Sequence, residues 1–226
     1  MPLLGSAAML LSFDVAPQAA AEHDDWHTHE HLPERLSIPG FLRGTRWTAL
    51  RGGPAYFVMY EVEGLATLTS GAYLDRLNHP SPWTAKMMRH YRGMTRAYCS
   101  VAGSVGFGIG GVASFVRFAR EPVTELARRE RLLRQHLVSL PARPGIGSAH
   151  WFEAELTPEI TTEQRIRGAD AIGNAALLLT GYREEALQDL LDSDFMHSLI
   201  AAQGAGGTSV ATYRLDYSLA RTELDK

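Results

Sequence analysis

The chain has 226 residues, enough for one large domain or two of about 100 residues each, and either arrangement can bury a core. Its apolar fraction of 45%, charged fraction of 21% and net charge of −3 are those of an ordinary globular protein. Without a basic run or a basic balance, nothing favours a nucleic-acid partner. Cys99 is the sole cysteine, which excludes an internal disulfide and leads us to expect a reducing, cytoplasmic location.

The N-terminal segment Met1–Phe13 is apolar, but it lacks a basic leader and is far shorter than the roughly 20 residues that span a bilayer. We therefore expect no membrane partner, and Met9–Val15 is typical of a buried first strand. Gln18–Glu30 has a helical composition. Because Pro33 cannot donate a backbone hydrogen bond, we expect this helix to break near His31 and a second short turn to follow.

A hairpin, two helices and a closing strand are expected in the rest of the first half. Phe41–Leu50 has interleaved polar and apolar residues, and Ala55–Glu63 is rich in aromatic and β-branched residues. A glycine-rich turn joins them, which favours an antiparallel pair of strands. Helices are expected at Ser70–Leu77 and Trp83–Tyr91, and a strand at Arg96–Val101. The resulting order is strand, helix, strand, strand, helix, strand.

The glycine-rich segment Gly103–Gly111 is typical of a linker, and the same order of elements recurs after it. The expected elements are the strand Val112–Ala119, the helix Val123–Leu137, the strands Ser148–Glu155 and Ala175–Tyr182, the helix Arg183–Ala202 and the strand Ser209–Tyr217. Two short motifs, Ile38–Phe41 and Arg143–Ile146, each contain Pro-Gly and precede a strand that carries a tryptophan. We therefore predict an α+β fold of two ferredoxin-like βαββαβ units fused in one chain, residues 1–104 and 105–226.

Two stretches carry a family resemblance. His31-Leu32-Pro33-Glu34-Arg35-Leu36 followed by Pro39-Gly40-Phe41, together with Asn78-His79-Pro80-Ser81-Pro82-Trp83, resembles the EthD-like branch of the dimeric α+β barrel proteins. The resemblance covers the first half, and the second half shares only the order of elements. It implies a sheet that packs on a second sheet to close a barrel, either within one chain or in a homodimer. The superfamily includes cofactor-free monooxygenases, small-lactone isomerases, haem enzymes and aldoxime dehydratases, so the resemblance does not choose a reaction.

The densest chemistry lies in residues 24–35, where three of the nine histidines fall within five positions. On a helix, His23, His27 and His31 share one face, and three imidazoles can suit zinc, copper or iron. However, consecutive turns of one helix rarely converge on one ion, and the His-Glu-x-x-His spacing is missing. A metal site on this stripe, or a haem bound by His31 or His90, is therefore a secondary hypothesis. We expect no metal and no cofactor.

The favoured hypothesis is a pocket for a small apolar or aromatic ligand, in which an oxygenase- or isomerase-like reaction transfers a proton. His31 is the expected proton-transfer residue because imidazole gains and loses protons near neutral pH, and Glu30 or Asp25 is expected to orient it. The other expected pocket residues are Trp26, His27, Tyr60, Trp83, His90 and Tyr91. Two alternatives remain open. In the first, His31 only caps the helix by bonding a free backbone carbonyl, and Glu34 and Arg35 form an ordinary surface ion pair. In the second, the protein is a non-catalytic ligand-binding or accessory protein of a degradation pathway.

Overall fold

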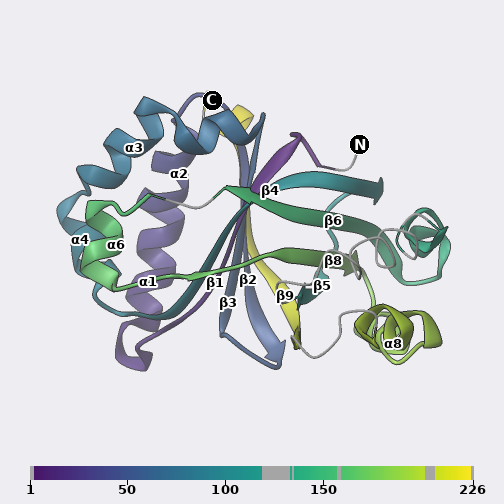
Figure 1. Cartoon of the computed structure of the whole chain (residues 1–226). Coiled ribbons are helices and arrows are strands. Elements are labelled where there is room, and N and C mark those ends of the chain that lie inside the picture. Colours follow the sequence, from purple (N-terminus) through teal and green to yellow (C-terminus); the bar gives the residue numbers. More distant parts are fainter. Residues whose placement is uncertain (1–2, 119–132, 134, 157–158, 202–206, 225–226) are drawn as a thin grey trace.

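Eight antiparallel strands close a barrel in the computed structural model, which describes residues 3–118, 133, 135–156, 159–201 and 207–224 (Figure 1). The barrel strands are β1 (Ala7–Val15), β2 (Phe41–Arg51), β3 (Tyr56–Val62), β4 (Tyr91–Gly106), β5 (Val112–Phe118), β6 (Ile146–Leu156), β8 (Ala175–Gly181) and β9 (Thr208–Ala220). Their order is β1-β3-β2-β9-β5-β8-β6-β4, and β4 pairs back to β1. The short β7 (Ala171–Ile172) pairs with β4 in parallel. Because the pairs β2–β9 and β4–β6 join the two halves, the barrel closes within one chain.

The first strand separates two hydrophobic cores. Ala8 and Leu10 point into the core inside the barrel, whereas Ala7, Met9 and Phe13 belong to the core under the helices of the first half. β1 is therefore buried on both faces. This explains why its sequence is a continuous apolar run rather than an alternation of polar and apolar residues.

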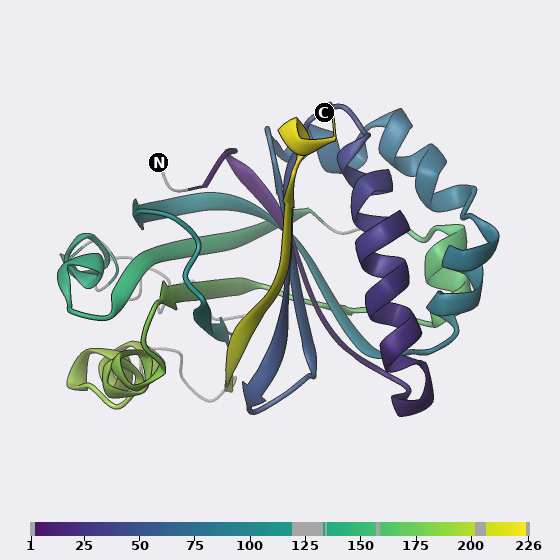
Figure 2. The ribbon, with the colours of Figure 1, turned by 180° about the vertical axis from the view of Figure 1, so that it is seen from behind.

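One layer of helices covers the outer face of the first-half strands, on the left of Figure 1. Its members are α1 (Ala20–Trp26), α2 (Leu32–Leu36), α3 (Gly71–Asn78), α4 (Pro82–Met88) and α6 (Thr162–Arg167). Of these, α6 comes from the second half, where the chain leaves β6, forms this six-residue helix beside α4 and returns to β8. The helices α7 (Glu184–Leu191) and α8 (Asp194–Ala201) lie at the opposite end of the molecule (Figure 2). Short 3₁₀ turns are η1 (Pro17–Ala19), η3 (Leu65–Thr69), η4 (Leu137–Ala142) and η6 (Arg221–Glu223).

The helix around the histidines runs without a break, so the prediction of a break near His31 is wrong. α1 and α2 are joined by a π-helical turn, η2 (His27–His31), and the residues flanking it keep helical backbone angles. The N–H of Leu32 bonds to the carbonyl of His27, five residues back. This wider turn accommodates the missing donor of Pro33, which lies in the first turn of α2, so the helix continues past the proline.

The glycine-rich segment is only partly a linker, because β4 continues through Gly106. Within it, a Cβ on Gly103 would lie 2.6 Å from Cδ2 of Leu137, so glycine here lets η4 pack directly on the strand. The linker predicted at Gly103–Gly111 is therefore confined to the few residues after Gly106, and the strand predicted at Arg96–Val101 is longer at both ends.

The connections of the second half differ most from the prediction. The sequence predicts no element between the strands β6 and β8, where the structure contains α6 and β7. The helix predicted at Arg183–Ala202 is two helices, α7 and α8, and the one predicted at Val123–Leu137 falls largely outside the described residues. Within the part of the chain that is described, no helix combines the length and the apolar character needed to cross a membrane.

Candidate functional site

A small cavity of about 30 Å³ lies between the helix layer and the outer face of the first-half strands. We call it the helix-side cavity. Its lining residues are Met9, Leu11, Phe13, His27, His31, Arg35, Tyr60, Tyr73, Leu77, Met88, Tyr91, Met94, Arg96, Glu163 and Arg167. At this size it holds only about two water molecules. Its walls are mainly aromatic and thioether side chains, and its charged groups are three arginines and one glutamate.

Two histidines of the π turn, His27 and His31, face this cavity with their ring centroids 5.5 Å apart. Neither Nδ1 atom has a hydrogen-bond partner among the described residues, while Nε2 of His27 lies 3.5 Å from the hydroxyl of Tyr60. Burial lowers the pKa of both imidazoles well below the ordinary value, and the positive charge of Arg35 lowers that of His31 further. Both rings are therefore neutral near pH 7, and each keeps a nitrogen lone pair that can accept a proton.

Packing around the π turn holds these rings in place. The indole of Trp26 lies against His31, with centroids 4.3 Å apart and ring planes inclined by 37°. On the sheet side, a Cβ on Gly44 would lie only 2.3 Å from Cδ2 of Leu32, so this glycine lets the helix approach β2 closely. The position of the histidines thus depends on packing against Trp26 and on the close approach of the helix to β2, as well as on their spacing in the sequence.

Helix α6 closes the cavity through buried ion pairs. Arg35 is 1% exposed, and its Nη2 donates to Oε1 of Glu163 over 2.5 Å. Burial alone would lower the pKa of the Arg35 guanidinium, but the negative charge of Glu163 raises it above the ordinary value. After α6, Oδ2 of Asp170 accepts a hydrogen bond of 2.6 Å from Nη2 of Arg167 and lies 3.0 Å from Nε of Arg96. The pairs Arg35–Glu163 and Arg96–Asp170 connect the second half to first-half residues that line the cavity.

Among the residues that the sequence singles out, His27, His31, Tyr60 and Tyr91 lie together at the helix-side cavity. Burial raises the pKa of both phenols, so their hydroxyls stay protonated at neutral pH. The Tyr91 hydroxyl is 3.1 Å from Nε2 of His23. These four residues come from the π turn, β3 and β4, which the fold brings together.

Glu30 and Trp26 lie beside the cavity but do not line it. Oε1 of Glu30 accepts hydrogen bonds from Ser81 Oγ at 2.5 Å, Trp26 Nε1 at 3.2 Å and Thr84 Oγ1 at 3.3 Å. The carboxylate therefore ties the π turn to the N-terminus of α4, and it makes no hydrogen bond to His31 among the described residues. Trp26 is fully buried and reaches the site through its contact with His31.

Trp83, His90 and Asp25 lie away from the cavity. Trp83 donates from Nε1 to Glu22 over 3.1 Å on the outer side of α1. The carbonyl of His90 accepts a backbone bond from Ala16, at the turn that precedes β4. The side chain of Asp25 is exposed. Helical periodicity alone cannot separate these outward positions from those that face the sheet.

The residues that sequence reasoning misses are charged and come from distant parts of the chain. Arg35, considered above as half of a surface pair, is buried against Glu163. Glu163 and Arg167 lie in a connection between two predicted strands where nothing local predicts a helix that reaches the first half. The one signal in the sequence is the length of this connection, which is much longer than a hairpin loop of about 2–5 residues and so indicates an additional element.

The histidine stripe predicted for a metal does form, with His23, His27 and His31 in sequence along one helix face. However, neighbouring ring centroids are 5.5 Å apart, and both ring nitrogens of His23 have partners, Asp24 and Tyr91, each at 3.1 Å. Across the described ranges, no three histidine, cysteine or acidic side chains are grouped so that they could hold a metal ion. The cavity of about 30 Å³ also has no room for a porphyrin.

The fold is similar to that of several solved structures, one of which is described as a ferredoxin-fold protein. No family model matches the chain, and no curated protein matches its sequence.

Three solved structures illustrate the similarity. An anthrone oxidase-like protein has a TM-score of 0.67 at 12% identity, over 95% of this chain and 92% of that one. A candidate monooxygenase from Fusobacterium nucleatum has a TM-score of 0.61 at 10% identity, over 96% of both chains. A ferredoxin-fold protein from Listeria monocytogenes, related to antibiotic biosynthesis monooxygenases, has a TM-score of 0.50 at 10% identity, over 95% of this chain and 97% of that one. At such identities the likeness establishes the fold alone.

Proposed function

We propose that the protein is an enzyme that takes a proton from a small apolar or aromatic molecule in the helix-side cavity, in an oxygenase- or isomerase-like reaction. The observation that carries this proposal is the pair of buried, neutral imidazoles, His27 and His31, whose Nδ1 atoms have no described partner. A buried polar atom without a hydrogen bond is costly, and such groups accumulate where a ligand completes the bonding. His31 is the proposed base, because His27 already has the Tyr60 hydroxyl near its Nε2.

The proposed step is the transfer of a proton from an acidic C–H or O–H group of the substrate to the neutral imidazole of His31. The cavity lining carries three arginines and Glu163, and Asp170 pairs with Arg96 and Arg167, so three cations face two carboxylates and one net positive charge favours the anion that remains. The likeness to an anthrone oxidase-like protein suggests a substrate with an activated CH₂ group. In that case the carbanion reacts with dioxygen, the CH₂ becomes a carbonyl and the second oxygen atom leaves as water. Anthrone and O₂ then give anthraquinone and H₂O.

Substrate entry requires the cavity to widen, because about 30 Å³ is far below the roughly 300–1,000 Å³ of a typical ligand pocket. We propose that α6 is the element that moves. It is six residues long and belongs to the second half. The ion pair of Glu163 with Arg35 holds it to the first half, and Asp170, just beyond its end, pairs with Arg96. Met9, Met88 and Met94 can adapt to the new volume, because unbranched thioether side chains repack easily.

Oxygen uptake and quinone formation with anthrone and its hydroxylated derivatives test this function. The wild-type protein should accelerate both, and His31→Gln should lower kcat by about 100-fold or more, the usual contribution of a general base. His29→Gln is the matched control, since His29 lies on the same turn with an exposed side chain. Binding by the wild type without turnover would favour the non-catalytic binding protein instead. If the wild-type protein neither binds nor turns over any of these compounds, the proposal is refuted.

We also propose that residues 1–104 and 105–226 are two ferredoxin-like units of an EthD-like tandem. Strand order supports this, since it is β4-β1-β3-β2 in the first half and β9-β5-β8-β6 in the second, which is the same order when strands are counted within each half. Closure of the barrel within one chain favours a monomer over a homodimer, and the unpaired Cys99 is compatible with the cytoplasm.

A further inference from the structure

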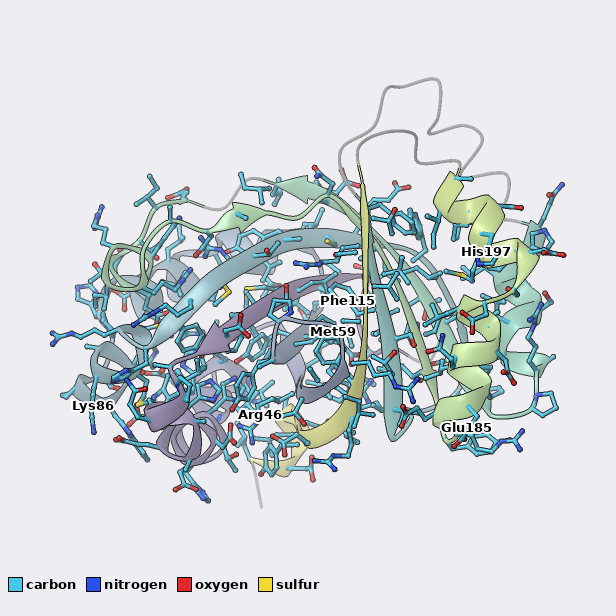
Figure 3. All side chains as sticks on the ribbon, turned by 90° about the horizontal axis from the view of Figure 1, so that it is seen from below. Arg46, Met59, Lys86, Phe115, Glu185 and His197 are labelled. Carbon is cyan, nitrogen blue, oxygen red and sulfur yellow. The ribbon has the colours of Figure 1, made fainter. Side chains whose placement is uncertain are left out.

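A second and larger cavity, of about 440 Å³, opens at one end of the barrel on the inner side of the strands. We call it the barrel-mouth cavity. Its apolar wall includes Leu10, Ala97, Cys99, Phe115 and Phe118. Phe115 and Met59, labelled in Figure 3, lie within the ring of strands and belong to the same interior core. The volume is within the range of small-molecule pockets, and Leu11 is the one residue that also lines the helix-side cavity, so the two sites are distinct.

The pairing of β4 explains why the barrel is open at this end. β4 pairs with β6 only from Tyr98 onward, and the preceding residues Thr95 and Arg96 pair on that side with the two-residue strand β7. The strand ring is therefore incomplete beside the ends of β5, β8 and β9, whose pairing brings Phe118 opposite Ala175 and Thr208. An opening to the barrel interior results.

Among the described residues that line this cavity, Arg117 is the single charged side chain. It reaches across the mouth from β5, where Nη1 donates to Ser12 Oγ over 2.8 Å and Nε donates to Ser209 Oγ over 3.0 Å. Within the described part of the chain, no carboxylate lies within 4.0 Å of its guanidinium. Burial lowers its pKa. A partly buried cation with only hydroxyl partners is poorly compensated, and two serines leave most of its five N–H donors available.

We propose that the barrel-mouth cavity is a second ligand site, which binds a small apolar molecule bearing a carboxylate through Arg117. The planar guanidinium matches a carboxylate in a two-point hydrogen-bonded pair, and the apolar wall takes the hydrocarbon part. One cation with two hydroxyl groups suits a single negative charge, whereas a phosphate would leave charge uncompensated. The site is independent of the proton-transfer function proposed for the helix-side cavity.

Calorimetric titration of the full chain with octanoate, and with 1-octanol as the uncharged analogue, tests this site. Arg117→Met should weaken octanoate binding at least 10-fold and leave the affinity for 1-octanol unchanged, which also shows that the variant is folded. Ala97→Phe fills part of the cavity and keeps Arg117 in the chain, so it should weaken the binding of both molecules. Arg117→Lys keeps the charge but loses the two-point geometry, and it should lie between Arg117→Met and the wild type.

The chain's single cysteine reports where the probe binds. Cys99 lines the barrel-mouth cavity, and burial raises the pKa of its thiol to about 12, so its reaction with N-ethylmaleimide should be slow. Octanoate should slow that reaction further in the wild type but not in Arg117→Met. Absence of octanoate binding by the wild type, or equal octanoate affinities for the wild type, Arg117→Met and Ala97→Phe, would overturn the proposal.

Discussion

His31 and Arg35 lie one helical turn apart, and although burial alone would lower the pKa of both, their neighbours leave them in opposite charge states. Burial and the neighbouring guanidinium lower the pKa of His31, whereas Glu163 more than offsets the effect of burial on Arg35. One face of one helix therefore carries a neutral base beside a permanent cation. This is the combination that removes a proton from a substrate and then stabilises the anion.

The buried imidazoles make stability depend on pH. Because the folded-state pKa of His31 lies below the unfolded value of about 6.5, the unfolded chain binds more protons as the pH falls below 6.5. The free energy of unfolding therefore keeps its full value above pH 6.5 and decreases as the pH falls toward the lowered folded-state pKa of His31. The free energy of unfolding should fall by up to about 1.4 kcal/mol per pH unit for each such histidine.

Urea unfolding between pH 7 and pH 5 measures this dependence. His31→Gln should flatten the pH dependence by about the contribution of one group, while the exposed control His29→Gln should keep the wild-type slope. A His31→Gln variant with the wild-type slope would mean that the pKa of His31 is not lowered in the folded protein, contrary to its burial in a site rich in arginine.

At the scale of elements, the attachment of α6 to α2 depends on the buried pair of Arg35 and Glu163. Glu163→Ala leaves the buried guanidinium with only the longer contact to Glu34, 3.5 Å away, and should lower the free energy of unfolding by about 3–5 kcal/mol. The double variant Arg35→Met/Glu163→Met removes both charges and should recover most of that loss. Glu184→Ala is the control, because Arg51 in the Glu184 pair is 62% exposed and such pairs contribute about 1 kcal/mol or less. Denaturant unfolding gives all three values, and a loss below about 1 kcal/mol for Glu163→Ala would contradict the buried pair.

Local patterns predict most of the barrel strands, because β-branched and aromatic runs between turn residues are signals contained within the strand itself. The continuous helix at Pro33 is not predictable in this way. A proline rule counts hydrogen bonds four residues back, whereas the π turn bonds Leu32 to His27 and is held by Trp26 and the close approach to Gly44. The placement of a helix through a proline thus depends on packing with other elements.

Some residues of the candidate site can likewise be predicted from local sequence patterns, and others cannot. His27, His31, Tyr60 and Tyr91 can be predicted, since each combines a suitable side chain with a position on an amphipathic helix or strand. Glu163 cannot, because its partner Arg35 is 128 residues away in the sequence and α6 has no local hydrophobic pattern that marks its destination. Long-range ion pairs of this kind become visible only when the fold is known.

At the scale of the whole molecule, the strand pairings close the barrel within one chain. The strands β2 and β4, which would be the edges of a single first-half sheet, are paired with β9 and β6. The hydrogen-bonding edges that a homodimer would use are therefore occupied. Sedimentation equilibrium should give the mass of one chain over a wide concentration range, and a stable mass of two chains would contradict the expected monomer.

The most direct test of the central claim is proton abstraction without oxygen, measured as the rate at which the CH₂ protons of anthrone exchange with deuterium in D₂O under anaerobic conditions. The wild-type protein should accelerate exchange over buffer, His31→Gln should abolish nearly all of that acceleration, and His29→Gln should retain it. No acceleration by the wild type, or an unchanged rate with His31→Gln, would contradict the assignment of His31 as the base.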